Sequence, residues 1–340
     1  MTLGQTQIYR LSIFATLLAF VVVVLGAYVR LSDAGLGCPD WPGCYGLLGA
    51  PVSEIEMQQA AQSYPGSEVD SAKAWKEMVH RYFAGTLGIA ILAIMIISLM
   101  QKDKHDQPIK LPIVLLVLVI FQALLGMWTV TLLLKPVIVM GHLLGGFATL
   151  SLLLLMALRM RQRVNPVTRV PVQTNLKLFS WIALIILIIQ IALGGWTSAN
   201  YAALACPDFP TCQGQWWPSM NYQEGFTLWR GLGMNYEGGL LSNEAQMAVH
   251  FTHRLGAFVT LLVLGFVAHV AMLRTTGSIR KVGILLFALL AVQILLGISN
   301  VVFSLPLLVA AAHNGVGALL LLAMVTMVYA AHSWTVREVN

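Results

Sequence analysis

The stretch that decides the fold is GAYVRLSDAGLGCPDWPGC at residues 26–44, because it returns at residues 194–212 as GGWTSANYAALACPDFPTC. In both copies an apolar segment runs into a Cys-Pro-Asp-aromatic-Pro-x-Cys loop. A His-Arg pair follows each copy, and a Gln-x3-Gly segment follows each pair. We therefore expect two related halves, residues 1–165 and residues 166–340, that each hold a similar site.

Each half is apolar enough for four membrane helices. The chain has 340 residues, of which 58% are hydrophobic and 10% are charged. About 20 consecutive apolar residues span a bilayer as a helix. Eight such stretches occur, near residues 9–31, 77–100, 111–134, 138–158, 176–198, 246–273, 282–303 and 307–331. The sequence predicts an all-α membrane protein whose eight transmembrane helices form two pseudo-symmetric four-helix bundles.

The charges indicate how the chain crosses the bilayer. A net charge of +6 would suggest nucleic acid in a soluble chain. Here the basic residues gather in the short segments after the second, fourth and sixth apolar stretches, whereas the two long loops carry acids. The positive-inside rule then places both termini in the cytoplasm and both long loops outside. We expect a multi-pass protein of a bacterial cytoplasmic membrane, with lipid and not nucleic acid around it.

The four cysteines form two Cys-x5-Cys pairs in the predicted outer loops. The outer compartment is oxidising, so we expect the disulfides Cys38–Cys44 and Cys206–Cys212. A metal site is the alternative, but no histidine or further cysteine lies within a few residues. A redox role for either pair stays open.

Four histidines point to a ligand. His80 and His142 are 62 residues apart, and His253 and His313 are 60 residues apart. Each is expected near the outer start of a helix that runs inward, so two imidazoles of one half lie at the same depth. Two facing imidazoles are the axial ligands of many haem irons. The alternative is a hydrogen bond between helices for each histidine.

Residues beside the histidines complete the predicted site. Arg81 and Arg254 could pair with haem propionates, or could reach the headgroups instead. Glu77 lies one helical turn before His80, where a carboxylate could move protons; an acid also favours a helix start on electrostatic grounds alone. His250 occupies the position of Glu77 in the second half, so we place the chemistry in the first half.

The combined pattern resembles the haem A synthase family, in its bacterial form with two outer cysteine pairs. The resemblance covers roughly residues 11–332 and implies oxidation of a ring methyl of haem O to a formyl group. It implies that His80 and His142 bind the substrate haem, that Glu77 is needed for activity, and that His253 and His313 bind a permanent haem b. Haem O synthase and assembly factors of terminal oxidases are the implied partners, and a homo-oligomer is compatible with it.

The mechanism expected is two successive hydroxylations of the methyl group, with electrons relayed through the bis-histidine haem b. The electron donor is unknown. A two-haem membrane cytochrome that takes electrons from quinol would share the four histidines but would not need Glu77. A haem chaperone for oxidase assembly would release its haem unchanged.

Overall fold

The computed structural model describes residues 3–101, 109–164 and 174–333. Within these ranges the chain is helical, without a named strand, and eight helices are long and apolar enough to cross a membrane. They are α1 (Leu3–Leu31), α3 (Ser71–Met100), α4 (Lys110–Thr131), α5 (Pro136–Val164), α6 (Thr174–Ala199), α8 (Asn243–Arg274), α9 (Gly277–Val302) and α10 (Leu307–Ser333). The predicted all-α multi-pass membrane protein is confirmed. The predicted boundary between residues 165 and 166 lies outside the described residues.

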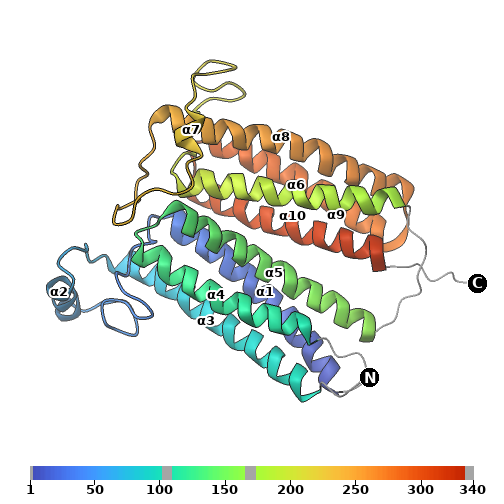
Figure 1. Ribbon diagram of the computed structural model, residues 1–340, viewed down its shortest axis with the longest axis horizontal. Coiled ribbons are helices and arrows are strands. Elements are labelled where there is room, and N and C mark those ends of the chain that lie inside the picture. The colour runs from blue at the N-terminus through green and yellow to red at the C-terminus, as the bar shows by residue number, and fades with distance from the viewer. Residues whose placement is uncertain (1–2, 102–108, 165–173, 334–340) are drawn as a thin grey trace, which may run out of the picture.

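The long helices pack as two rings of four. In the first ring α1 contacts α3, α3 contacts α4, α4 contacts α5, and α5 returns to α1. The second ring repeats this order with α6, α8, α9 and α10. The rings meet through α1, α5, α6 and α10, as Figure 1 shows. The two short helices, α2 (Glu54–Ser63) and α7 (Tyr222–Gly225), lie at the end of the bundle opposite to the start of α1.

Caps explain why α3 and α8 begin earlier than their apolar stretches. The side chain of Asp70 accepts hydrogen bonds from the main-chain N–H groups of Ala72 (2.8 Å) and Lys73 (3.0 Å). Ser242 caps α8 in the same way through Ala245 N–H. Such caps satisfy donors that the first helical turn leaves free. His80 therefore lies between two and three turns inside α3, deeper than its predicted place near the outer start of the helix.

Tight turns join α4 to α5 and α9 to α10. Leu133 and Leu134 adopt positive φ angles of 49° and 59°, and Ser304 and Leu305 adopt 54° and 63° in the second half. The next helix begins at or just after a proline, whose fixed φ suits a first helical turn. Because both turns are short, the second helix of each pair runs directly back along the first.

Apolar side chains fill the centre and also cover the outside. The buried core joins the two rings through residues such as Leu153 and Met156 of α5 and Leu320 and Met324 of α10. On the outside, Leu17, Ile89 and Val117 are 64%, 70% and 63% exposed. Large apolar side chains on the outer faces of long helices are what a surrounding lipid bilayer requires.

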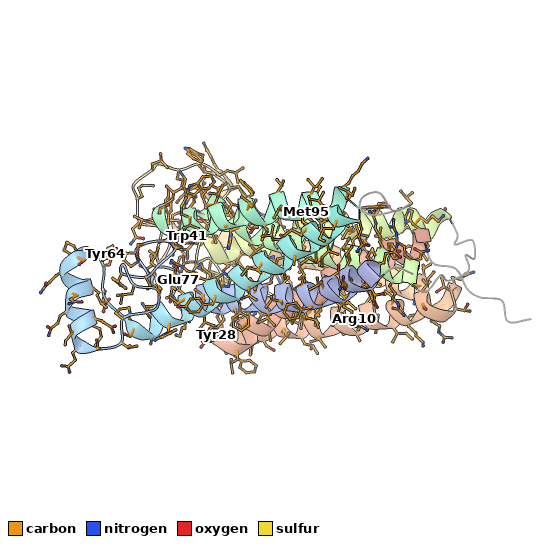
Figure 2. All side chains as sticks on the ribbon, turned by 90° about the horizontal axis from the view of Figure 1, so that it is seen from below. Arg10, Tyr28, Trp41, Tyr64, Glu77 and Met95 are labelled. Atoms are coloured by element: carbon orange, nitrogen blue, oxygen red, sulfur yellow. A yellow bond between two sulfur atoms is a disulfide. The ribbon has the colours of Figure 1, made fainter. Side chains whose placement is uncertain are left out.

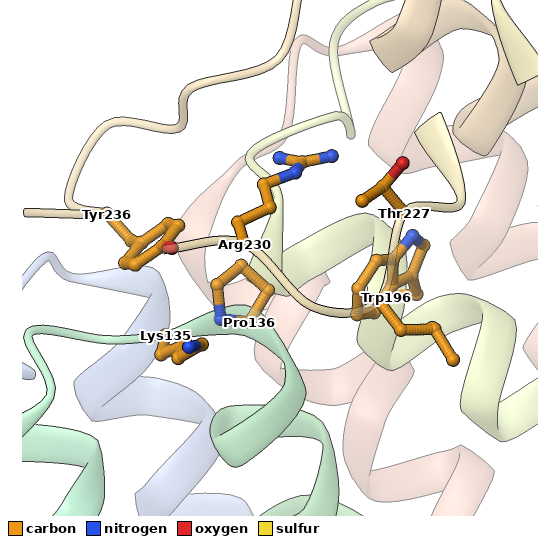
Figure 3. A pocket seen from close by; sticks show the side chains of 7 residues that line it. Lys135, Pro136, Trp196, Thr227, Arg230 and Tyr236 are labelled. Carbon is orange, nitrogen blue, oxygen red and sulfur yellow. The ribbon is translucent and has the colours of Figure 1, made fainter. Parts of the chain in front are cut away.

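Two cationic residues connect the halves at the loop end. The ammonium of Lys135 lies 3.4 Å from the ring centre of Trp229 and 3.3 Å from the carbonyl of Gly231, in the long loop of the second half. Figure 3 shows Lys135 beneath this loop, close to Tyr236. A second contact between the halves is made by Arg30, which donates to the carbonyl of Ser198 at 2.7 Å. The ammonium and the guanidinium thus reach from the first half to the second.

Candidate functional site

The first pair of predicted histidines lies together inside the first ring of helices. The ring centroids of His80 on α3 and His142 on α5 are 6.5 Å apart, and the ring planes are nearly perpendicular, at 83°. Nδ1 of each ring is buried and has no hydrogen-bond partner among the described residues. The main chain of Val22 on α1 and of Gln122 on α4 also reaches these rings, so a hydrogen bond between helices would still leave Nδ1 of each histidine without a partner.

Each histidine ring rests on a glycine of a neighbouring helix, where a side chain would collide. A methyl group built on these glycines would meet the Cε1 atoms of the rings at 3.0–3.3 Å, which is tighter than ordinary contact. The four pairs are Gly26 with His80, Gly126 with His142, Gly194 with His253, and Gly297 with His313. These glycines lie in the repeated stretches and in the Gln-x3-Gly segments, but the sequence did not show that they contact the histidines.

The second pair differs from the first by its side-chain partners. Nε2 of Gln190 lies 3.0 Å from Nδ1 of His253, and Nε2 of Gln293 lies 3.3 Å from Nε2 of His313. His253 lies on α8 and His313 on α10, and α6 contacts both of these helices. Each of these glutamines joins two helices, and in each case its partner is a histidine.

The predicted disulfides Cys38–Cys44 and Cys206–Cys212 are both present. The two loops have the same backbone: each has a cis peptide before its second proline, at Pro42 and Pro210. The aspartate inside each loop closes it, because Asp40 accepts N–H bonds from Tyr45 and Gly46 and Asp208 accepts them from Gln213 and Gly214. This closing role of the aspartates was not predicted, although both lie in the repeated motif.

Glu77 and Arg81 fasten the first disulfide loop to α3. Oε2 of Glu77 accepts the main-chain N–H of Cys38 at 2.9 Å, and Oε1 accepts from Arg81 at 2.5 Å. Arg81 also donates to the carbonyls of Asp40 (2.9 Å) and Gly43. Figure 2 shows Glu77 at the loop end of the bundle. Glu77 is only 5% exposed, so its charge is balanced mainly by Arg81.

The same clamp recurs in the second half with an imidazole. Nδ1 of His250 accepts the N–H of Cys206 at 3.3 Å, and Arg254 donates to the carbonyls of Cys206 (2.7 Å) and Thr211 (2.8 Å). The predicted propionate contacts of Arg81 and Arg254 stay predictions, while the structure shows loop carbonyls as their partners. Glu77 and His250 occupy equivalent places, as the alignment of the halves predicted.

Tyr45 connects the first disulfide loop to the segment that precedes α3, outside the membrane helices. Its hydroxyl donates to the carbonyl of Glu68 at 2.9 Å. Burial, and then the nearby negative charge of Glu77, raise the pKa of Tyr45 above its usual value. The hydroxyl is therefore a neutral donor that ties the loop to the segment before α3.

The first histidine pair fits a haem iron. Two imidazoles that share one metal ion have centroids about 6 Å apart, because each metal–nitrogen bond is about 2 Å long and each nitrogen lies about 1 Å from its ring centre. The observed separation is 6.5 Å. Together with the buried, unbonded Nδ1 atoms, this spacing suits axial ligation by His80 and His142. Each ring could supply its remaining nitrogen to the iron.

Known proteins share this sequence over almost its full length. The model of the cytochrome oxidase assembly protein family matches residues 9–325. A heme A synthase of Shewanella oneidensis is 46% identical over 324 residues, which cover 95% of this chain and 96% of that protein. Heme A synthases of Nitrosospira multiformis and Caulobacter vibrioides are 29% and 27% identical, over 89% and 94% of this chain and 87% and 93% of theirs.

The family match extends from α1 into α10 and so includes both disulfide loops and all four histidines. The chain therefore belongs to the haem A synthase family of cytochrome oxidase assembly proteins.

Proposed function

We propose that this protein is a haem A synthase, an oxidoreductase that converts haem O to haem A. The observation that carries the proposal is the buried pair His80 and His142, 6.5 Å apart, one helical turn from the buried carboxylate of Glu77. The names of its relatives, heme A synthase, support it across the same residues. The product is suited to terminal oxidases, in keeping with the family's description as assembly proteins.

We assign different tasks to the two halves. His80 and His142 bind the iron of the substrate, haem O, in the first half. His253 and His313 hold a resident haem b in the second half, where both rings already have glutamine partners. When bound, this haem b supplies one-electron transfer. The unequal support of the two histidine pairs favours one exchanging and one permanent haem.

Two successive hydroxylations of the ring methyl would give a geminal diol, each taking one oxygen atom from an external oxidant such as dioxygen together with two electrons and two protons. One hydroxyl of the diol then loses a proton, the other leaves as water, and the formyl group remains. The diol loses a proton from one hydroxyl, so an acceptor beside the substrate is useful. Glu77 supplies two carboxylate oxygens one helical turn from His80, and the Arg81 guanidinium holds them in place. Glu77 therefore serves as the proton acceptor, and Arg81 serves as the residue that positions it.

The orientation follows from the charges. We propose that both termini face the cytoplasm and that the disulfide loops and both histidine pairs lie toward the outer face of the cytoplasmic membrane. Haem O delivered by a haem O synthase in the same membrane could enter from the lipid. Transfer of haem A to an oxidase assembly factor would follow on the same side.

The test is expression with a haem O source, followed by extraction and mass analysis of the haems. We expect haem A from the wild type, and haem O or its hydroxylated product from Glu77→Ala and Glu77→Gln. The lipid-facing Ile89→Ala in the same helix is the control and should form haem A normally. Absence of haem A from the wild type would exclude the synthase and leave an electron-transfer cytochrome or a haem chaperone.

The extracted haems also separate those two alternatives. A cytochrome would hold two unmodified haems that are reduced by quinol, and a chaperone would release unmodified haem to an acceptor. If Glu77→Ala still accumulates haem A at the wild-type level, the proton-transfer role of Glu77 is wrong while the synthase assignment stands.

A further inference from the structure

The four histidines have similar surroundings, but one neighbouring position holds a different residue type beside His80 than beside the other three. The residue four places before each supporting glycine lies beside the same histidine, at positions 22, 122, 190 and 293. Positions 122, 190 and 293 are glutamine, whereas position 22 is valine. Val22 on α1 is the counterpart of Gln190 on α6, because residues 26–44 align with residues 194–212. His80 is thus the one member of the four without a carboxamide on the adjacent helix.

In the second half the carboxamides act on the rings directly. Gln190 lies 3.0 Å from Nδ1 of His253 and also donates to the His253 carbonyl at 3.1 Å. Gln293 lies 3.3 Å from a ring nitrogen of His313. A hydrogen bond to a ligating imidazole fixes its tautomer and orientation, and its loss typically costs about 10–100-fold in metal affinity.

In the first half both carboxamide contacts are missing. Val22 has no polar side chain and meets His80 only through its main chain. Nε2 of Gln122 is buried without a hydrogen-bond partner among the described residues. The space has changed as well. Gly256, three residues after His253, makes room for Gln190, since a methyl group there would lie 2.2 Å from the Gln190 Oε1. Phe83 stands three residues after His80, so the amide and the room for it are both absent.

We propose that Val22 makes His80 the axial ligand that can leave the iron, whereas Gln190 and Gln293 keep His253 and His313 in place. This inference rests on the proposed haem-binding function. It gives a physical reason why one half can expose a coordination position on its haem and the other half cannot. Val22, Gln190 and Gln293 are positioning residues, because they act through the histidines and not on the haem itself.

Carbon monoxide binding to the reduced, haem-loaded protein tests the proposal without using catalytic activity. Carbon monoxide occupies an iron only where an axial ligand can leave. We expect the wild type to bind it at one of its two haems, and Val22→Gln/Phe83→Gly to weaken that binding about tenfold or more. The matched control Val22→Leu/Phe83→Gly adds no amide and should bind as the wild type does. Conversely, Gln190→Val should allow the second haem to bind carbon monoxide.

The absorbance shift on adding carbon monoxide and the haem content per chain are measured on the same samples. The proposal fails if the wild type binds no carbon monoxide while holding two haems, or if the glutamine and leucine double variants bind equally. It also fails if the second haem of Gln190→Val does not bind carbon monoxide. This single variant tests the proposal even if a double variant does not fold. A wild type that retains no haem would overturn the proposed function instead.

Discussion

Glu77 and His250 accept the same hydrogen bond in the two halves of the molecule. Oε2 of Glu77 takes the N–H of Cys38 at 2.9 Å, and Nδ1 of His250 takes the N–H of Cys206 at 3.3 Å. Nε2 of His250 also lies 3.3 Å from Nε of Arg254. A neutral imidazole can accept at one nitrogen only, so His250 cannot accept from both groups at once, whereas a carboxylate has two acceptor oxygens. Glu77 can therefore hold both the loop and Arg81. Tethering the loop is common to both halves, and the charge is particular to the first.

Replacing Glu77 should loosen the first disulfide loop in two steps. Glu77→Gln keeps an oxygen for the Cys38 N–H but loses the ion pair, and Glu77→Ala loses both. Because the pair is buried, we expect Glu77→Ala to lower the free energy of unfolding by about 3 kcal/mol and Glu77→Gln by less. Thermal unfolding in detergent measures this. His250→Ala is the matched variant of the second loop, and it should be milder, since no ion pair is lost; an equal or larger loss there would contradict the argument.

Alanine at the supporting glycines should displace one histidine pair at a time. A methyl group on Gly26 or Gly194 would lie 3.0 Å from Cε1 of His80 or His253. We expect Gly26→Ala to weaken haem binding in the first half at least fivefold and Gly194→Ala to weaken it in the second. Absorbance of the purified protein titrated with haem measures both.

The control for these variants is Gly85→Ala on α3, where nothing lies within 4 Å of the added methyl group. It should bind haem like the wild type. If Gly26→Ala and Gly85→Ala behave alike, the contact between Gly26 and His80 has no influence on the site.

Arg30 should contribute to the contact between the halves. It donates to the Ser198 carbonyl at 2.7 Å and lies 3.9 Å from the ring centre of Tyr201. Removing a partly buried hydrogen bond and a cation–π contact costs about 1–3 kcal/mol. We expect Arg30→Leu to lower the unfolding temperature in detergent. Arg10→Leu, at an exposed position of the same helix, is the control; a similar decrease in both would show that the contact between the halves adds nothing.

Acid should open the second disulfide loop. Hydrogen bonds from the Thr211 hydroxyl and from the Gly214 and Gln213 N–H groups hold the pKa of Asp208 below its usual value near 4. A carboxyl whose pKa is lower in the folded state stabilises it above the unfolded-state value, and this stabilisation is lost as the pH falls through the folded value. We expect faster amide exchange at Gln213 and Gly214 below about pH 4. Asp208→Asn should remove the pH dependence, and an unchanged exchange profile in that variant would refute the assignment.

The helices and their duplication could be predicted from the amino-acid sequence alone. Eight apolar stretches had to become helices, since a bilayer leaves the backbone no other partners, and the repeated frame placed two histidines and one disulfide loop in each half. The pairing of each Cys-x5-Cys was also determined locally, because the loop is short. The starts of the helices were less predictable. Asp70 and Ser242 cap α3 and α8, and each helix therefore begins with polar residues that lie before its apolar stretch.

The contacts of each polar group depend on how the helices and loops pack, and these contacts could not be predicted from the sequence. Arg81 and Arg254 follow their histidines in the sequence, yet their donors turn to the disulfide loops, because those carbonyls lie some forty residues away in sequence and beside them in space. The same holds for Val22 and Gln190, whose difference has meaning only once α1 and α6 are seen against His80 and His253. A repeat fixes which residues correspond, but packing between helices determines which of them touch.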